Sequence, residues 1–392
     1  MPRHQHWLLT DLSEPELPYE PLFLEADQWP GVFPAPWRIS RRTLHGGKRE
    51  GVEVIEVDNS LLSFMVSPTR GMSICRGRFR GWPLGWRAPI QGPVHPTWVN
   101  TLDRGGLGWL DGFDEWIVRC GLSSNGPPGE DPVTKEFLPL HGRIANQPAS
   151  FVEVKVNLEP PFDLQITGKV QEATMFFSNL LLTTTITTVP GSNRLSIEDE
   201  ITNLLSKPAE LELLYHCNFG PPLLEAGSRV RLPLKELAPR TTRAAEGIAV
   251  WDTFLGPTSG YTEQVYFTEL LADTQGTTLA VLHDSDQKKG VALRWNVPSL
   301  PRFILWKNTV PWDEGYVTGL EPATNYPNFK AVEREQGRLV TLAPGETYRC
   351  GFVVEVFDER QPGLAEVCAE VDRLQATAEA LIHPLPVTKW GG

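Results

Sequence analysis

Alternation of apolar and polar side chains with a period of two residues, interrupted by turn residues, is the feature that most limits what this chain can fold into. In residues 151–158 the valines at every second position share one face of an extended strand, and charged or polar residues take the other face. Two hairpins are expected, one from residues 180–189 and 195–201 and one from residues 278–282 and 290–297. A third is expected around Pro344-Gly345.

The strands recur without an alternating helix, so a parallel sheet is not expected and an all-β fold of antiparallel strands is predicted. Residues 46–358 carry this pattern and should form one domain. Residues 1–45 are rich in Pro and acidic groups and are expected to form an N-terminal extension packed over the domain. Residues 359–392 should supply a helix and a tail. The apolar residues near helical spacing are Leu364, Val367, Val371, Leu374 and Leu381.

Charge and composition exclude several classes of partner. The 392-residue chain has a formal net charge of −12, which disfavours nucleic acid and anionic membrane surfaces as partners. It has no apolar run long enough to span a membrane, and its first 21 residues lack the apolar core of a signal peptide. Its five scattered cysteines suit a reducing compartment. A cytoplasmic protein is therefore expected, with its oligomeric state left open.

Motifs for nucleotide and metal binding are missing from the sequence. Gly105-Gly106-Leu107-Gly108 is rich in glycine, but it does not lie between a strand and a helix as a dinucleotide loop would. The chain has no Cys-x-x-Cys pair, and its eight histidines are dispersed. We therefore expect no cofactor and no metal. Residues 93–136, rich in Gly, Pro and Trp with weak periodicity, are interpreted as a long functional loop.

Three segments place polar groups where catalytic chemistry could occur. The first contains His141-Gly142-Arg143. In the second, strand alternation puts Leu214, His216 and Asn218 on one face, just before a Gly-Pro-Pro turn. The third contains Gly319-Leu320-Glu321-Pro322, in which Gly319 and Glu321 share a face. Taken singly, such a histidine is as compatible with a structural role, and such a glutamate with a surface position.

Together the three segments resemble the aldose 1-epimerase superfamily, also called galactose mutarotase-like. The shared motifs are His141-Gly142, the strand-borne His216 before Phe219, Leu320-Glu321-Pro322 and a closing Leu-x-Pro-Gly-Glu hairpin. The resemblance covers about residues 50 to 357. It is closest to a poorly characterised bacterial branch with His-Gly-Arg, Tyr-His-x-Asn-Phe-Gly, Trp-Lys and Gly-Leu-Glu-Pro. It implies a β-supersandwich fold, in agreement with the strand pattern.

The resemblance also implies an activity, the interconversion of sugar anomers by acid–base ring opening of a small carbohydrate. Glu321 would be the general base and His216 the general acid. The residues expected to contact the substrate are His141, Arg143, Arg70, Asn218, Trp306 and Lys307. Ordinary galactose mutarotases have His-Gly-Gly and a Tyr-Phe pair after the catalytic histidine. This chain has Arg143 and Cys217-Asn218-Phe219 there, so the groups that contact the sugar should differ.

Two other classes of function remain compatible with the sequence. One is a carbohydrate-binding module without turnover, although a binder needs neither His216 nor Glu321 in those positions. The other is a different sugar-active enzyme on the same fold, such as an open-chain sugar isomerase, a lyase or a glycosidase. A glycosidase requires two acids at a defined separation, and we find no second carboxylate of comparable standing. The sequence does not identify the sugar or show whether it is phosphorylated.

Overall fold

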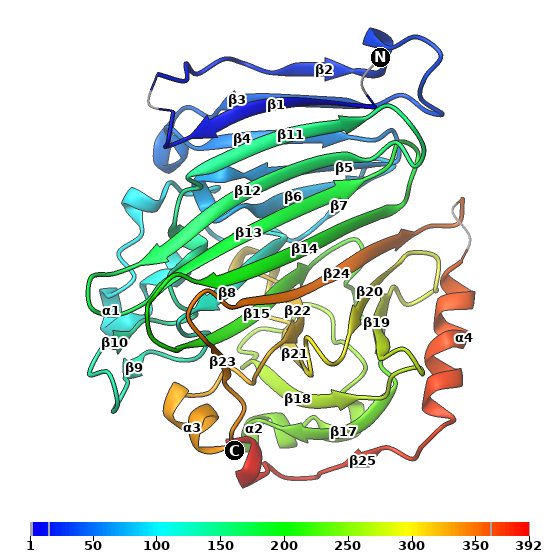
Figure 1. Ribbon diagram of the computed structural model, residues 1–392. Helices are drawn as coiled ribbons and strands as arrows, with labels where there is room; N and C mark the ends of the chain where they lie inside the picture. Colours follow the sequence, from blue (N-terminus) through cyan, green and yellow to red (C-terminus); the bar gives the residue numbers. More distant parts are fainter. Residues whose placement is uncertain (1–2, 15, 361–362, 392) are drawn as a thin grey trace.

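Two large β-sheets packed face to face form the body of the protein (Figure 1). The computed structural model describes residues 3–14, 16–360 and 363–391. The first sheet has nine described strands, in the spatial order β1 (His4–Asp11), β11 (Phe151–Asn157), β12 (Leu164–Ala173), β13 (Asn179–Thr188), β14 (Arg194–Asn203), β24 (Thr347–Phe357), β20 (Gly290–Asn296), β19 (Thr277–His283) and β16 (Arg229–Arg231).

The second sheet has fourteen described strands and carries the residues of interest. Its main path runs in the order β2 (Phe23–Glu25), β3 (Arg38–Thr43), β4 (Glu53–Asp58), β5 (Leu62–Ser67), β6 (Ser73–Phe79), β8 (Ile117–Leu122), β15 (Ala209–Phe219), β22 (Val317–Ala323), β21 (Arg302–Asn308), β18 (Gln264–Leu270), β17 (Leu234–Pro239) and β25 (Leu381–Ile382). Two more strands lie off this path, β7 (Trp82–Leu84) beside β6 and β23 (Val340–Leu342) beside β15. A separate small sheet pairs β9 (Gly129–Glu130) with β10 (Phe137–Leu138).

The core lies between the two sheets and follows from the alternation in the sequence. Val152, Val154 and Val156 of β11 are fully buried there, as are Ile55 of β4 and Leu213 of β15. The predicted all-β fold is confirmed, and neighbouring strands are antiparallel except for the short pair β17 and β25, which is parallel. Burial of one face of each sheet against the other stabilises the sandwich through the hydrophobic effect.

Two of the three expected hairpins form, and the third does not. β13 pairs with β14, and β19 pairs with β20, as the alternation predicts. The prediction that β23 and β24 form a hairpin is wrong, because β23 pairs with β15 while β24 pairs with β14 and β20 in the other sheet. Between β23 and β24 the chain passes from the second sheet to the first, and Asn203 at the end of β14 binds this connection. Its side-chain amide nitrogen donates to the carbonyls of Leu342 and Ala343, and its backbone carbonyl accepts from the Gly345 N–H.

Both ends of the chain join the sheets. Residues 1–45 contribute β1 to the edge of the first sheet and β2 and β3 to the edge of the second. Helix α4 (Leu364–Gln375) packs its apolar face, which includes Val367 and Val371, on β19 and β20. Leu381, which the spacing places near this helix, lies in β25 instead. No helix in the described part of the chain is long and apolar enough to cross a bilayer.

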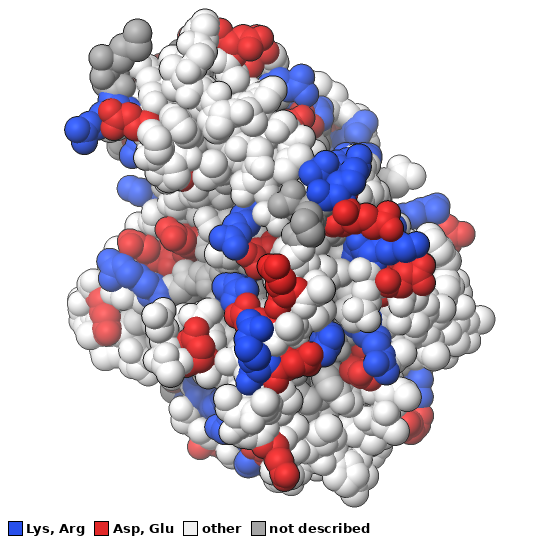
Figure 2. Space-filling model, turned by 90° about the vertical axis from the view of Figure 1, so that its right-hand side faces the viewer, with Lys and Arg blue, Asp and Glu red and all other residues white. Residues whose placement is uncertain are grey.

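The face that carries α4 shows acidic and basic side chains interspersed rather than a patch of one sign (Figure 2). Two ion pairs fasten the helix to the strands beneath it, Arg294 with Glu370 and Arg231 with Asp372. The remaining α-helices of the described residues, α1 (Asp103–Gly106), α2 (Thr242–Ala245) and α3 (Lys330–Glu335), are short and lie in connections between strands, as do several single turns of 3-10 helix.

A second apolar cluster covers the outer face of the fourteen-stranded sheet. Trp109 and Phe113, from the long segment 93–136, pack there against Val118, Leu214 and Phe267 of the sheet. The irregular segment therefore forms a cover over the strands that carry His216 and Glu321.

Candidate active site

His216 and Glu321 face each other across two neighbouring strands. The antiparallel register of β15 and β22 pairs Cys217 with Leu320, which places His216 opposite Glu321. The two side chains point away from the sandwich core, and His216 Nε2 lies 3.2 Å from Glu321 Oε1. They are only 5% and 3% exposed, so the pair lies in a nearly closed site.

Gly319 makes room for the carboxyl group of Glu321. A Cβ atom at Gly319 would lie 2.3 Å from Glu321 Oε1 and 3.2 Å from His216 Cε1. Glycine is thus the residue that lets the carboxyl group fold back along its own strand toward the imidazole. The Gly-Leu-Glu motif has a steric reason in this site.

Asn218 fixes the proton on the far side of the His216 ring. Its amide nitrogen donates to the Glu115 carbonyl at 3.0 Å and to the His216 carbonyl at 3.2 Å. The Asn218 Oδ1 atom therefore faces His216 Nδ1, at 2.6 Å, and can only accept. Nδ1 must then carry a hydrogen, which leaves Nε2 to exchange protons on the side of Glu321.

Burial sets the protonation of the pair. It lowers the pKa of His216 to about 3, with a further lowering from His141, and the hydrogen bond with Asn218 opposes the shift. Burial raises the pKa of Glu321 well above its ordinary value, with Glu263 adding to the rise and Arg240 opposing it. In the free site these shifts favour a neutral imidazole and a protonated carboxyl over the ion pair that a Glu base and a His acid would require.

The Glu321 carboxyl group retains unused hydrogen-bonding capacity. Its contact with His216 is poorly aligned for a hydrogen bond, and Oε1 has no other hydrogen-bond partner among the described residues. A buried oxygen without a partner is costly, so the site is suited to a ligand that donates a hydrogen bond there.

Aromatic rings enclose the pair. The ring centroids of Phe113 and Trp306 lie 5.0 Å and 5.2 Å from that of His216. Trp306 stands opposite Gly319 in the sheet, and its indole N–H donates to Glu263 at 2.6 Å. The flat apolar faces with one polar edge are of the kind that sugar rings contact.

His141 borders the same group of rings. Its centroid lies 4.7 Å from that of Trp109 and 5.8 Å from that of His216. Its Nδ1 donates to the Asn125 carbonyl at 2.8 Å, which leaves Nε2 as an acceptor in the neutral ring. Burial lowers the pKa of His141 to about 4. The next residue, Gly142, has a φ of +71°, and a Cβ there would lie 2.3 Å from two backbone oxygens.

Three of the residues expected to contact substrate are engaged elsewhere. All five N–H groups of Arg70 face acceptors, which are Glu115, Asn146 and the carbonyls of Val94 and Gly112. Arg143 pairs with Glu136 at 2.6 Å. Lys307 donates to three backbone carbonyls between 2.7 and 3.1 Å, on the face of β21 opposite Trp306. The structure thus places His141, Asn218 and Trp306 next to His216 and Glu321. Arg70 and Lys307 instead stabilise the surrounding loops through their hydrogen bonds.

Arg240 and Glu263 are two residues near the pair that were not predicted from the sequence. Arg240 directly follows β17, Glu263 directly precedes β18, and these two strands pair in the sheet. Both influence the pKa of Glu321, so they belong to its surroundings. The only signal in the sequence was a charged residue at the end of each strand, which is too common to single them out.

Comparison with known proteins agrees with this fold. The family model described as domain of unknown function DUF4432 matches residues 49–356. A solved structure from Klebsiella pneumoniae subsp. pneumoniae, provisionally named an aldose 1-epimerase, is 34% identical with a TM-score of 0.93, over 98% of this chain and 99% of that chain. A galactose mutarotase-like protein from Clostridium acetobutylicum is 13% identical with a TM-score of 0.56, over 82% and 98%.

No curated protein matches the chain. The match to the family model includes all three polar motifs, from His141 through His216 to Glu321. The similarity to the Klebsiella structure extends over nearly the whole of both chains. The chain therefore belongs to the DUF4432 family and has the galactose mutarotase-like β-supersandwich fold.

Proposed function

We propose that the protein interconverts the anomers of a small sugar, as an aldose 1-epimerase does. The observation that carries the proposal is the contact of 3.2 Å between His216 Nε2 and Glu321 Oε1 in a buried, aromatic-walled site. Ring opening requires one proton to leave the anomeric hydroxyl and one to reach the ring oxygen. A pair that holds one transferable proton supplies both functions.

In this mechanism Glu321 is the base and His216 the acid. The carboxylate takes the proton of the O1 hydroxyl, a C1=O1 double bond forms, and the C1–O5 bond breaks. The electron pair of that bond goes to O5, which takes the proton from His216 Nε2. Rotation about the C1–C2 bond and the reverse steps close the other anomer, and no atom or electron is gained or lost.

The protonation of the free site fits this cycle. Ring opening converts a carboxylate and an imidazolium into a carboxyl and a neutral imidazole, which is the state that burial favours without substrate. Transfer of one proton across the contact restores the reactive form without changing the net charge of the site. A sugar hydroxyl that donates to Glu321 Oε1 would favour the carboxylate, since this oxygen has no other hydrogen-bond partner among the described residues.

The remaining groups have supporting roles in the proposal. Asn218 positions His216 and does not contact the sugar, because its amide is already bound to Glu115 and His216. Trp306 forms a wall for the ring, and His141 accepts a sugar hydroxyl at Nε2. Arg143, which is paired with Glu136, would reach the substrate only at the margin of the site.

The test is catalysed equilibration of pure anomers, followed by polarimetry, across a panel of neutral aldoses, hexose phosphates and hexuronic acids. We expect acceleration over buffer for at least one member of the panel. Binding of a sugar without acceleration would instead favour a carbohydrate-binding module. Absence of both across the panel would contradict the proposal.

A further inference from the structure

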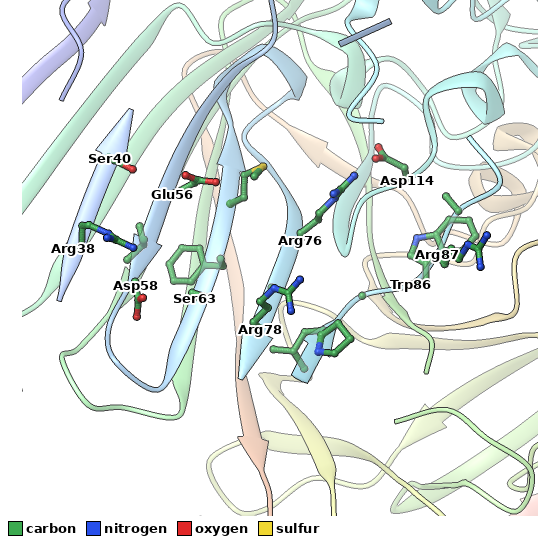
Figure 3. A pocket seen from close by; sticks show the side chains of 18 of the residues that line it. Arg38, Ser40, Glu56, Asp58, Ser63, Arg76, Arg78, Trp86, Arg87 and Asp114 are labelled. Carbon is green, nitrogen blue, oxygen red and sulfur yellow. The ribbon is translucent and has the colours of Figure 1, made fainter. Parts of the chain in front are cut away.

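A groove of about 810 Å³ lies on the outer face of the second sheet (Figure 3). Neither His216 nor Glu321 is among the residues that line it. Its floor consists of the outward-facing side chains of β3, β4, β5 and β6. Their neighbours along each strand, such as Ile39, Val57 and Phe64, are buried in the sandwich core. A wall is formed by the chain from Pro83 to Ile90, which includes Trp86 and Arg87.

The floor is ordered into two cross-strand rows by the register of these four strands. One row runs Ser40, Glu56, Met65, Arg76, and the other runs Arg38, Asp58, Ser63, Arg78. Arginines thus stand on β6 and on β3, three strand spacings apart, which is about 14 Å. Carboxylates and hydroxyls lie between them, as the labelled side chains in Figure 3 show.

The arginines of the floor are not neutralised. Among the described residues Arg38, Arg76 and Arg78 form no ion pair, and the contacts of Arg76 and Arg78 are to the carbonyls of Gly92 and Gly81. Glu56 is already engaged by Arg42, which does not line the groove, through two hydrogen bonds of 3.2 and 2.8 Å. Burial raises the pKa of Asp114 to about 7, so it is only partly ionised at neutral pH. Asp58, opposite Arg38, is the remaining carboxylate of the lining. The three guanidinium groups outnumber the carboxylates left to balance them, so the groove is positive in a chain whose net charge is −12.

The groove approaches the acid–base pair through shared aromatic residues. Trp86 lines the groove, and its ring centroid lies 5.0 Å from that of Phe113. Phe113 in turn lies 5.0 Å from His216. The carbonyl of Glu115 accepts from both Trp86 and Asn218. The groove and the His216–Glu321 site thus lie on the same face of the second sheet, and Trp86, Phe113 and Glu115 separate them.

We infer that this groove binds an acidic oligosaccharide. A guanidinium group recognises a carboxylate through paired, charge-assisted hydrogen bonds, and two arginine positions about 14 Å apart need a ligand with repeated carboxylates. Ser40, Ser63 and Asp58 would bind the hydroxyl groups between them. The choice of a saccharide rests on the proposed function, whereas the negative charge of the ligand rests on the groove alone.

The test is isothermal titration of the full-length protein with di- and trigalacturonate, with maltotriose as the neutral probe and orthophosphate as the simple anion. We expect trigalacturonate to bind more tightly than maltotriose, and the affinity to fall with added salt. Arg76→Ser combined with Arg78→Ser should weaken binding at least about tenfold. Arg38→Ser should weaken binding of the trimer and leave that of the dimer unchanged. The matched control, Arg349→Ser, changes an exposed arginine of the other sheet.

Glu321→Gln separates this inference from the proposed function, because it should leave binding in the groove intact whether or not the protein is an epimerase. Equal affinity for trigalacturonate and maltotriose, or for wild type and the double variant, would overturn the inference. So would orthophosphate that competes at the same concentration as trigalacturonate. Sedimentation provides a further check, because a wild-type dimer that the double variant converts to monomers would make this face a self-interface instead. Circular dichroism would verify that each variant is folded.

Discussion

Asn218 Oδ1 lies 2.6 Å from His216 Nδ1, on the side of the imidazole ring away from Glu321. This contact assigns the ring hydrogen to Nδ1 and leaves Nε2 for proton transfer. It also explains why a polar residue follows two positions after the histidine on the same face of β15. The proposed chemistry depends on this orientation as much as on the two reacting groups themselves.

Asn218→Ala should remove that orientation without changing the sugar contacts. We expect kcat for anomer exchange to fall by roughly 10² or more, with KM little changed. Nitrogen-15 NMR of the imidazole should show loss of the single Nδ1–H tautomer, a signature that a purely structural role would not alter. Asn193→Ala is a suitable control, because its amide donates to Val356 far from the site. A variant with normal kcat would remove Asn218 from the mechanism.

Gly319→Ala tests whether the carboxyl group must fold back over its own strand. The added Cβ would lie 2.3 Å from Glu321 Oε1, so the carboxyl group must move. We expect a loss of about 10²-fold in kcat/KM, since displacements of this size commonly cost that much. Gly256→Ala is the control, because its Cβ would meet only Ala226 at 3.3 Å. Unchanged kcat/KM in Gly319→Ala, with the fold intact, would show that the position of Glu321 is not critical.

The histidines of the site should make stability depend on pH. Burial lowers the pKa of His216 to about 3 and that of His141 to about 4, whereas in the unfolded chain both are near 6.5. Between the folded and unfolded pKa values, the unfolded state therefore binds more protons than the folded state. The stability that the two neutral histidines contribute is fully present above about pH 6.5 and is lost as the pH falls toward about 4. Each histidine contributes a slope of at most about 1.4 kcal/mol per pH unit.

Urea denaturation at pH 7, 6 and 5 measures that slope. His141→Asn combined with His216→Asn should reduce it, whereas His45→Asn, at an exposed position, should not. Glu321 acts in the opposite direction, because burial raises its pKa in the folded state. Its contribution to stability is present below the pKa that it has in the unfolded chain, and is lost as the pH rises through the folded-state pKa. The comparison must therefore keep Glu321 constant. An identical slope in the double variant would show that the two rings are not desolvated as described.

Arg70 is expected to contribute to stability rather than to turnover. Arg70→Met would leave Glu115 buried without its counter-charge and should lower the free energy of unfolding by about 3–5 kcal/mol. Adding Glu115→Gln should recover part of that loss, since the uncompensated charge is then removed. Denaturant titration of the single and double variants measures both effects. A single variant as stable as wild type would contradict the role that the four hydrogen bonds and the ion pair of Arg70 indicate.

The sheet-rich fold and the proximity of His216 to Glu321 could be predicted from the sequence for different reasons. Alternation in β11 and β13 is a local property, so it could be read directly. The pair His216 and Glu321 came from motif resemblance, because strand register, which brings them together, depends on long-range pairing. β23 is a second example, because its alternation predicts a strand but does not show which strand it pairs with. Its partner is β15, which is distant in the sequence.

The contacts of the site were harder to predict than its two central residues. Lys307 follows Trp306 in β21 and therefore points to the opposite face, where backbone carbonyls surround its ammonium group. The arginine that approaches Glu321 is Arg240, which only the pairing of β17 with β18 brings near. Trp109 and Phe113 come from a segment without periodicity, whose path over the sheet no local pattern specifies.

Glu321 is proposed to take the proton of the anomeric hydroxyl, and NMR exchange spectroscopy between the α and β anomers measures the rate of that step. The sugar is the one that wild type equilibrates fastest, and Glu321→Gln is compared with wild type and with Glu346→Gln, a surface control in the turn before β24. We expect Glu321→Gln to remain folded and to lose roughly 10²- to 10⁴-fold of the exchange rate, while the control retains the wild-type rate. Exchange by Glu321→Gln within a few-fold of wild type would contradict it.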